Sequence, residues 1–450
     1  MSKKIAIIGA GVTGISAAMH LAQRGAEVHI FEATQHIGGR ARSFRERTTG
    51  ETIDNGQHVL MGCYHEFLKV LALLKTDHLL ARQPALKVLF LDANGRRDML
   101  DTSRLPGKAG IAAGILLLKN VSLASRLKAF SFAAKLQLGL LKSEEVSCYD
   151  FLKKHGQTDE MITRFWEPII IATLNADPRQ AASVLLTEVL KRAFFGGREA
   201  SQLIIPKVGL SELLAPFKSW LQANGGKVHM SEPIHQILFK NECAVGLKLS
   251  NGEEFACDAV ISAIPPRALL RILPPEIAAH ESFKTISATL GEYEFSPIVS
   301  LYLWLDREIM GEDFAAMLGT TTQWVFNRRA FTDAAPDLLK KYPGHVSLTV
   351  SAGNSLVDTA PEQVALQCFG ELQAAFPAAR DAKLLEWKVI KEKAATFLAT
   401  PHFEPKRIKA ETPLSNFVLA GDWTATQLPA TLEGAAQSGV KAAELVIGYA

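Results

Sequence analysis

The first thirty-two residues carry the pattern that most restricts the fold of this chain. An apolar run, Lys4 to Ile8, is typical of a parallel strand that is buried on both faces. Three glycines follow at the spacing Gly-x-Gly-x-x-Gly, and an alanine-rich helical pattern comes after them. A second strand is expected at Glu27 to Phe31, and Glu32 closes it. This order of elements predicts a βαβ unit that binds a dinucleotide.

Each part of this unit has a physical role. Gly9 permits the tight turn, Gly11 lets a pyrophosphate approach the backbone, and Gly14 lets the helix pack closely on the strand. Glu32 is placed to accept hydrogen bonds from a ribose diol, and its charge disfavours a 2′-phosphate, which argues against NADP. A glycine pattern alone is weak evidence, but the flanking strand, helix and acid make a chance match a poor explanation.

A second glycine-rich segment, Gly38-Gly39-Arg40-Ala41-Arg42, begins six residues after Glu32. Its two glycines bring backbone close to a cofactor, and its two arginines supply donors for phosphate or flavin-side contacts. In isolation the segment would be interpreted as a basic surface turn. Its position directly after the ribose-binding acid favours a cofactor contact and a flavin dinucleotide.

A third candidate cofactor segment lies near the C-terminus. A buried strand is expected to end at Gly421-Asp422, and a helix is expected to follow a loop containing Pro429. The helix start contains Thr431, Glu433, Gly434 and Ala435. A helix N-terminus aimed at the flavin pyrimidine edge would stabilise the negative charge of the reduced ring. An ordinary amphipathic helix would explain the apolar periodicity but not the Gly-Asp strand end.

Size and composition narrow the remaining possibilities. A chain of 450 residues exceeds one hydrophobic core, so two domains are expected. The net charge of +3, without basic runs interleaved with aromatics, argues against nucleic acid as a partner. Five scattered cysteines without metal-ligand spacing predict reduced cytosolic thiols and no metal site. The N-terminus resembles a signal peptide, but cleavage would destroy the glycine loop; no transmembrane helix is expected.

Taken together, these motifs resemble the flavin amine-oxidase-like superfamily, which includes monoamine oxidases, protoporphyrinogen oxidases and phytoene desaturases. Within it, the chain is most similar to the hydroxysqualene dehydroxylases, the squalene-associated desaturases of bacterial hopanoid pathways. Three motifs belong to the whole superfamily: Gly9 to Gly14, Gly38 to Arg42, and Gly421-Asp422. Narrower motifs carry the subfamily resemblance: Asp54 to Leu60, Phe165 to Pro168 with Ala172 to Asn175, and Gln323 to Arg328.

The resemblance implies an α/β fold with a discontinuous Rossmann-like FAD/NAD(P)-binding domain and an interleaved α+β substrate domain, as in amine oxidases. The FAD-binding domain would comprise residues 1–75, 204–268 and 405–450. The substrate domain would comprise residues 76–203, which read as largely helical, and residues 269–404. The implied cofactor is FAD. Its implied contacts are Gly9, Gly11, Val12, Thr13, Gly14, Glu32, Gly38, Gly39, Arg40, Arg42, Gly56, Gln57, His58, Ile234 (through its backbone, to the adenine), Gly421, Asp422, Thr431, Glu433, Gly434 and Ala435.

The implied activity is reductive dehydroxylation of hydroxysqualene, an apolar C30 isoprenoid alcohol, with hydride from reduced flavin. The electron donor is not identified by the sequence. The expected substrate pocket contains Trp166, Asn175, Trp324 and Phe326, although each aromatic singly is also an ordinary packing residue. Two other classes remain open: a phytoene-desaturase-like or amine-oxidase-like enzyme, and a non-catalytic flavin-binding partner in an isoprenoid assembly.

The general acid that would help water to leave is not determined. Asp54 and His58 are candidates, but a turn-capping aspartate and a hydrogen-bonded structural histidine are the stronger interpretations. One departure from the family pattern adds a question, because Ala394 stands where the family has arginine.

Residues 104–142 contain seven basic residues and no acidic residue, interleaved with apolar runs. The plain interpretation is a pair of core-packing helices with a solvated basic face. For an enzyme acting on a C30 lipid, the same pattern also predicts peripheral contact with anionic lipid. The expected location is therefore cytoplasmic, with an optional association at the inner face of the cytoplasmic membrane.

Overall fold

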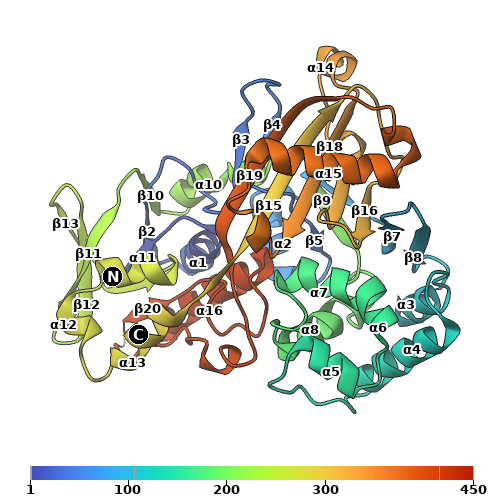
Figure 1. The fold of residues 1–450 in the computed structure, drawn as a ribbon. Helices are drawn as coiled ribbons and strands as arrows, with labels where there is room; N and C mark the ends of the chain where they lie inside the picture. Colours follow the sequence, from blue (N-terminus) through green and yellow to red (C-terminus); the bar gives the residue numbers. More distant parts are fainter. Residues whose placement is uncertain (1–2, 106, 415, 449–450) are drawn as a thin grey trace.

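A computed structural model describes residues 3–448 of the chain, apart from residues 106 and 415. Figure 1 shows three regions: a parallel sheet with α1 and α16 beside it, a larger mixed sheet, and a helical region around α3 to α8. The fold is α/β with mixed sheets, as the sequence predicts.

The parallel sheet has the strand order β10-β2-β1-β14-β20. Every neighbouring pair in it is parallel, with Ile5 opposite Val28 on one side and opposite Ala259 on the other. Its strands are β1 (Lys4–Ile8), β2 (Glu27–Glu32), β10 (Lys227–Met230), β14 (Ala259–Ser262) and β20 (Phe417–Leu419). Three distant segments therefore build one sheet, and the carboxyl ends of their strands meet at one edge. The domain boundaries given above stay predictions.

Two helices from opposite ends of the chain pack against each other beside this sheet. They are α1 (Val12–Ala22) and α16 (Leu432–Gly448). A Cβ at Gly439 would lie 2.3 Å from the Thr13 carbonyl oxygen, so the two backbones are in contact. The Ser16 hydroxyl donates to the Ala436 carbonyl at 2.8 Å. The small residues of α16 thus serve close packing on α1.

The mixed sheet has seven strands in the order β19-β15-β18-β17-β16-β7-β8. They are β7 (Lys87–Asp92), β8 (Arg97–Asp101), β15 (Phe295–Leu305), β16 (Phe314–Leu318), β17 (Trp324–Asn327), β18 (Gly344–Ser351) and β19 (Leu384–Phe397). All pairs are antiparallel except β16 with β7. One face, with Leu301 and Leu348, joins a core that includes α15 (Pro361–Ala375). The other face carries aromatic and polar residues such as Tyr302 and Ser347.

The helical region forms part of the largest hydrophobic core. It contains α3 (Gly107–Leu116), α4 (Leu123–Gln137), α5 (Cys148–Lys154), α6 (Asp159–Met161), α7 (Glu167–Leu174) and α8 (Ser183–Val189). Two π-helical segments, η2 (Ile162–Trp166) and η3 (Leu190–Phe194), continue these helices. π-helical turns are rare in proteins overall, but those that occur are often found at functional sites.

Smaller elements connect these regions. The three-stranded sheet β5-β9-β6 consists of β5 (Leu60–Met61), β9 (Leu203–Pro206) and β6 (Leu80–Arg82). A meander consists of β11 (Ile234–Lys240), β12 (Cys243–Leu249) and β13 (Glu254–Ala256), and a hairpin consists of β3 (Ser43–Arg45) and β4 (Thr52–Asp54). The remaining helices are α2 (His65–Leu73), α9 (Leu210–Leu214), α10 (Phe217–Ala223), α11 (Pro266–Ile272), α12 (Pro275–Ala278), α13 (Lys284–Glu292) and α14 (Pro336–Lys341).

Candidate functional site

The three glycines of the first loop have different surroundings. Gly9 has a φ of +98°, which a residue with a side chain rarely adopts. A Cβ at Gly14 would lie 2.0 Å from the Gly9 carbonyl oxygen, so Gly14 allows the helix to approach the strand. A Cβ at Gly11 would meet no protein atom within 4 Å. The loop therefore leaves open space at Gly11, where a pyrophosphate fits.

Glu32 lies at the carboxyl end of β2, beside this loop. One carboxylate oxygen accepts the Ala10 backbone N–H at 3.0 Å, and the other accepts both donors of Thr34 at 2.9 Å. The Glu232 backbone N–H donates to the Glu32 carbonyl at 3.0 Å. Ile234, predicted to contact the adenine, follows two residues later at the start of β11. The structure thus brings the predicted ribose and adenine residues to the same edge of the sheet.

The second glycine segment lies directly against the first loop. The Gly38 N–H donates to the Ala10 carbonyl at 2.8 Å, and Gly38 forms an isolated β-bridge with Gly11. A Cβ at Gly39 would lie 3.3 Å from the Gly11 Cα. Arg42 is exposed, and its carbonyl accepts the Asn55 N–H at 2.9 Å. Backbone contacts therefore join the first two predicted cofactor segments.

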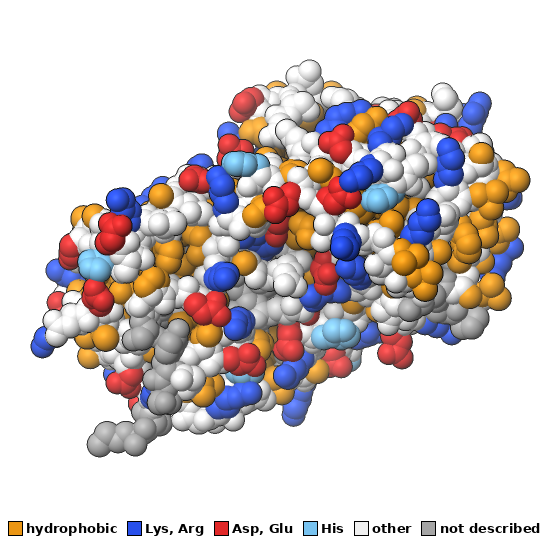
Figure 2. Space-filling view, turned by 90° about the horizontal axis from the view of Figure 1, so that it is seen from below, with side chains coloured by type: hydrophobic (Ala, Val, Ile, Leu, Met, Phe, Trp, Pro, Cys, Tyr) orange, Lys and Arg blue, Asp and Glu red, His pale blue; other side chains and the backbone are white. Residues whose placement is uncertain are grey.

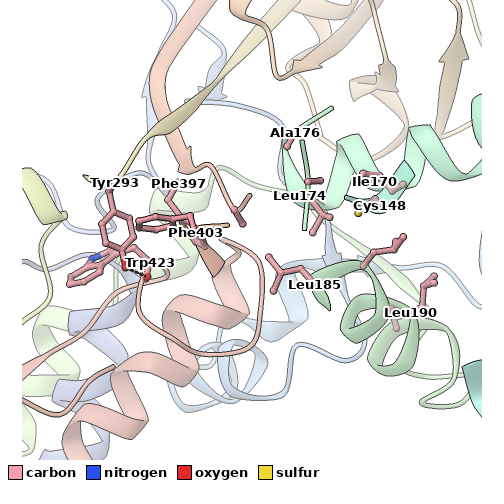
Figure 3. Close-up of a cluster of buried hydrophobic side chains, with 14 of the residues drawn as sticks. Cys148, Ile170, Leu174, Ala176, Leu185, Leu190, Tyr293, Phe397, Phe403 and Trp423 are labelled. Carbon is pink, nitrogen blue, oxygen red and sulfur yellow. Dashed lines mark hydrogen bonds between the residues drawn. The ribbon is translucent and has the colours of Figure 1, made fainter. Parts of the chain in front are cut away.

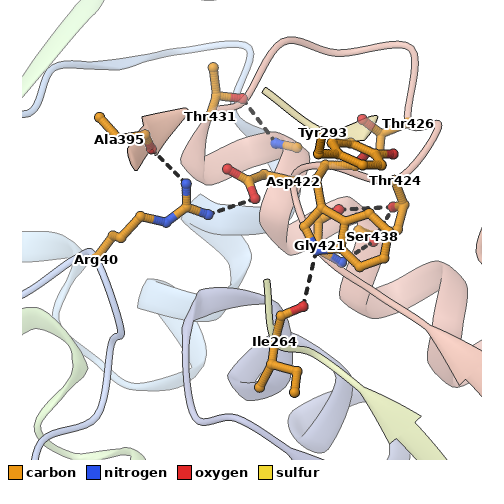
Figure 4. A network of polar contacts seen from close by, with 12 residues as sticks. Arg40, Ile264, Tyr293, Ala395, Gly421, Asp422, Thr424, Thr426, Thr431 and Ser438 are labelled. Atoms are coloured by element: carbon orange, nitrogen blue, oxygen red, sulfur yellow. Dashed lines mark hydrogen bonds and ion pairs between the residues drawn. The ribbon is translucent and has the colours of Figure 1, made fainter. Parts of the chain in front are cut away.

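Arg40 connects the second segment to the third, as Figure 4 shows. Its guanidinium pairs with Asp422 at 2.6 Å and donates to the Ala395 carbonyl at 2.6 Å. The negative charge of Asp422 raises the pKa of Arg40. Gly421, next to Asp422, donates its N–H to the Ser438 hydroxyl of α16 at 2.9 Å. Arg40 and Asp422 form an ion pair with each other. This pair fixes the position of the second predicted cofactor segment relative to the third.

The start of α16 has two differently placed polar residues. The Thr431 hydroxyl accepts the Gly434 N–H at 3.0 Å, as in a helix cap. The buried Glu433 carboxylate accepts the backbone N–H groups of Phe67 and Glu66, at 3.0 and 3.2 Å, in the first turn of α2. Ala435 is also buried. Glu433 therefore stabilises the N-terminus of α2, while Thr431 and Gly434 lie nearer the strand-end loop.

Asp54 is buried and hydrogen-bonded on several sides. Its carboxylate accepts the Ser43 hydroxyl at 2.6 Å and the Leu210 N–H at 3.0 Å. Its backbone exchanges hydrogen bonds with the Tyr302 hydroxyl at 3.2 Å. Asp54 therefore joins β4, α9 and the mixed sheet, which is a structural arrangement.

His58 follows the turn, and its Nδ1 lies 2.7 Å from the Gly56 carbonyl oxygen. Burial lowers the pKa of His58, against the opposing effect of Asp54. A neutral imidazole with Nδ1–H on a carbonyl presents Nε2 as an acceptor. This geometry does not supply a proton donor at neutral pH.

Three of the four predicted pocket residues, Trp166, Trp324 and Phe326, lie in or against one hydrophobic core, and the fourth, Asn175, is a buried polar residue. The Asn175 amide donates to the Ser296 carbonyl and the Thr396 hydroxyl and accepts the Ala352 N–H, so it ties α7 to the mixed sheet. Trp166 is buried in the helical region and donates to Gln157 at 2.9 Å. Trp324 and Phe326 stack on β17, with ring centroids 6.4 Å apart. The structure brings this last pair together.

The apolar region extends to the cofactor segments. Figure 3 shows part of the cluster: Tyr293, Phe397, Phe403 and Trp423 lie on one side, and aliphatic residues of the helical region lie on the other. Partly exposed side chains pack on this cluster at its margin: Val59, Met61, Cys63, Ile169, Ile264, Trp324 and Ala430. Ala394 is exposed, within an irregular stretch of the pairing between β19 and β15.

A buried polar cluster was not predicted from the sequence. Glu51 pairs with Arg329 and with His345, whose Nδ1 lies 3.2 Å from the carboxylate, and it also accepts the Trp304 indole N–H. Burial lowers the pKa of His345 to about 4. Burial alone would raise the pKa of Glu51, but hydrogen bonds from His345, Arg329 and Trp304 hold it well below its usual range. No local pattern brings residues 51, 329 and 345 together.

Fold and site together define an α/β protein with a dinucleotide-binding loop. The model of the flavin containing amine oxidoreductase family matches residues 12–447, and the chain belongs to this family. The predicted FAD cofactor and FAD-dependent oxidoreductase class are thereby confirmed. The open space at Gly11 and the joined glycine segments fit the group.

Individual relatives indicate which members of this family the chain is similar to. A hydroxysqualene dehydroxylase of Sinorhizobium fredii (strain NBRC 101917 / NGR234) is 30% identical over 99% of both chains. The 15-cis-phytoene desaturase of Synechococcus elongatus is 22% identical, over 99% of this chain and 96% of that protein. The crystal structure of an oxidoreductase from Methanosarcina mazei has a TM-score of 0.75 at 18% identity, covering 98% of this chain and 100% of that chain. The predicted resemblance to the hydroxysqualene dehydroxylases is confirmed.

Proposed function

We propose that this protein removes the hydroxyl group of hydroxysqualene reductively and releases squalene. The observation that carries the proposal is the full-length similarity to hydroxysqualene dehydroxylases, at 30% identity against 22% for a phytoene desaturase. The apolar cluster beside the cofactor segments supports a hydrocarbon substrate. Bound FAD, once reduced, would supply the hydride for the allylic carbon that loses oxygen.

The chain's own residues provide the surroundings for this reaction. The stacked Trp324 and Phe326 present aromatic faces that stabilise positive charge on an allylic carbon. The apolar cluster excludes water, which would otherwise capture such a cation. The neutral imidazole of His58 and the hydrogen-bonded carboxylate of Asp54 leave the proton for the departing oxygen to another donor.

An anaerobic single-turnover experiment tests this function. The purified flavoprotein is reduced, hydroxysqualene is added, and flavin reoxidation and squalene formation are followed together. Equal amounts of oxidised flavin and squalene are expected. No reoxidation by hydroxysqualene refutes the proposal. Hydrogen peroxide formed from amines would instead identify an oxidase, and flavin inert to every substrate would identify a binding protein.

We also propose that the helical region contacts the surface of an anionic membrane. Half of the exposed large hydrophobic side chains in the described chain lie between residues 105 and 140. They are Leu105, Leu117, Leu123, Leu127, Phe130, Leu138 and Leu140. Figure 2 shows hydrophobic side chains gathered at the end of the molecule that carries α3 and α4. Exposed lysines such as Lys128 and Lys135 lie on α4 among them.

This arrangement fits peripheral attachment. No helix among the described residues is long and apolar enough to cross a membrane. Apolar side chains can enter the lipid boundary while neighbouring lysines meet anionic headgroups, as at the inner face of a cytoplasmic membrane. A small apolar pocket lies just inside this surface. Its lining residues are Ile111, Ile115, Ala133, Phe165, Trp166, Ile169, Leu190, Phe194 and Phe195.

Co-sedimentation with vesicles tests the membrane contact. Vesicles containing phosphatidylserine should retain the protein more strongly than neutral vesicles. A variant with Leu127→Ser, Phe130→Ser, Lys128→Gln and Lys135→Gln should lose most of this binding. The matched control is Leu366→Ser, which removes an equally exposed leucine from α15. Unchanged binding of the fourfold variant would refute the contact.

A further inference from the structure

Arg328 is a buried cation without a carboxylate partner among the described residues. It begins the short turn η4 (Arg328–Ala330) after β17, and only 2% of its surface is exposed. No acidic side chain of the described chain lies within 4.0 Å of its guanidinium, and its Nε has no hydrogen-bond partner there. Burying an uncompensated charge is costly, so its retention calls for a specific reason.

The next residue in the chain shows what a structural arginine looks like here. Arg329 pairs with Glu51 through two nitrogens and donates to the Tyr342 carbonyl at 2.8 Å. Burial lowers the pKa of the adjoining His345, so that ring is neutral at pH 7. The Glu51 carboxylate is thus paired with Arg329 and not with Arg328. Arg328 is left without a direct ion pair among the described residues.

Arg328 contacts the turn at residues 54–58, which is predicted to lie along the flavin, through the amide of Gln57. Its Nη1 donates to the Gln57 Oε1 at 3.3 Å, and the Ser347 hydroxyl donates to the same oxygen at 2.9 Å. Two donors on one oxygen determine the orientation of the amide, which is otherwise ambiguous. The Nε2 end then donates to the His58 carbonyl at 3.2 Å. Gln57 is thus held with its acceptor toward Arg328 and its donor toward the turn.

The turn itself adjoins the cofactor segments. The Asn55 amide donates to the Arg40 carbonyl at 3.3 Å, and Arg40 pairs with Asp422. A Cβ at Gly56 would lie 2.9 Å from the Ser300 hydroxyl, so the turn is pressed against β15. Asp54 forms no direct ion pair with Arg328; its carboxylate accepts hydrogen bonds from the Ser43 hydroxyl and the Leu210 N–H.

We propose that Arg328 is a positioning residue that fixes the Gln57 amide so that the second N–H of its Nε2 is left for the flavin ring, and that the positive charge of Arg328, which no direct ion pair cancels, favours the reduced ring. Two-electron reduction with uptake of one proton makes the ring anionic, so a nearby cation favours the reduced form. This inference goes beyond the proposed function. It rests on the FAD of the family and not on the identity of the substrate.

The midpoint potential of the bound flavin tests the proposal in the holoenzyme. Arg328→Gln should weaken the preference for the reduced form at least tenfold, which is about 30 mV lower for a two-electron couple. Arg328→Lys should keep most of the wild-type potential, because it restores the charge. Arg45→Gln removes an exposed arginine and is the matched control.

A second variant keeps the test decisive if Arg328→Gln fails to fold or to hold flavin. Gln57→Leu leaves the cation in place but removes the amide, and it should also lower the potential. Wild-type potentials in flavin-loaded Gln57→Leu and Arg328→Gln would overturn the proposal, and Gln57→Leu alone decides if Arg328→Gln holds no flavin. A lowered potential in a protein that does not turn over hydroxysqualene would support it and refute the proposed function alone.

Discussion

The parallel sheet and the mixed sheet build their functional edges in opposite ways. At the parallel sheet, glycines leave room: a Cβ at Gly11 would meet nothing, and Gly38 lies against the same loop. At the mixed sheet, large side chains such as Tyr302, Trp304 and His345 fill the face, and hydrogen bonds and the Arg329–Glu51 ion pair hold them. The edge of the parallel sheet thus depends on missing side chains, and this face of the mixed sheet depends on buried polar ones.

The largest expected effect separates two glycines of one loop. Gly14→Ala would place a methyl group 2.0 Å from a backbone oxygen, so α1 must shift. We expect a loss of more than about 3 kcal/mol of stability and no bound flavin. Gly11→Ala should fold with wild-type apo-protein stability but bind flavin weakly. Thermal unfolding measures the stability of each variant, and the flavin-to-protein absorbance ratio measures its flavin content. Equal stabilities of the two variants would contradict the conclusion that Gly14 serves helix packing and Gly11 serves cofactor binding.

The second prediction tests the buried polar cluster on the face of the mixed sheet. Glu51→Gln leaves the Arg329 guanidinium buried without its carboxylate, which should cost about 3–5 kcal/mol. Denaturant midpoints of the apo-protein measure this loss. Glu281→Gln, in an exposed pair with Lys284, should change stability by less than about 1 kcal/mol. If both substitutions had the same small effect, the cluster would not support the sheet.

A pH titration of stability probes His345 directly. Because burial lowers its pKa from 6.5 to about 4, the unfolded chain binds a proton that the folded chain does not bind between these values. The part of the folding stability that depends on the neutral His345 is fully present above pH 6.5, and it is lost as the pH falls toward 4. The expected loss is about 3 kcal/mol, and His345→Gln should remove that part of the slope. An unchanged slope in the variant would assign the acid sensitivity to other groups.

The smallest effect concerns His58. Its lowered pKa and its bond to the Gly56 carbonyl fit a neutral ring that orients the turn. We expect His58→Ala to retain flavin and to lose less than about tenfold in turnover, on the scale of one neutral hydrogen bond. Loss of all turnover with full flavin content would restore His58 as the general acid.

The cofactor edge was predictable because its signals are local. The glycine spacing, the strand before it and Glu32 fall within one short segment. The mixed sheet was not predictable in detail, because β7 pairs with β16 across more than two hundred residues and nothing local records that register. Glu433 shows the same limit. Its position indicates a helix start, but its partners Glu66 and Phe67 lie 367 and 366 residues away.

The packing of α16 across α1 has a consequence for synthesis of the chain. Translation produces α1 among the first residues, yet the helix that covers it, and Ala436 that accepts the Ser16 hydroxyl, come 420 residues later. The glycine loop and α1 are therefore synthesised long before α16 can pack on them. Native contacts of such long range also form slowly. Shortening α16 should leave the nascent chain dependent on chaperones, although no predicted substrate-pocket residue would be altered.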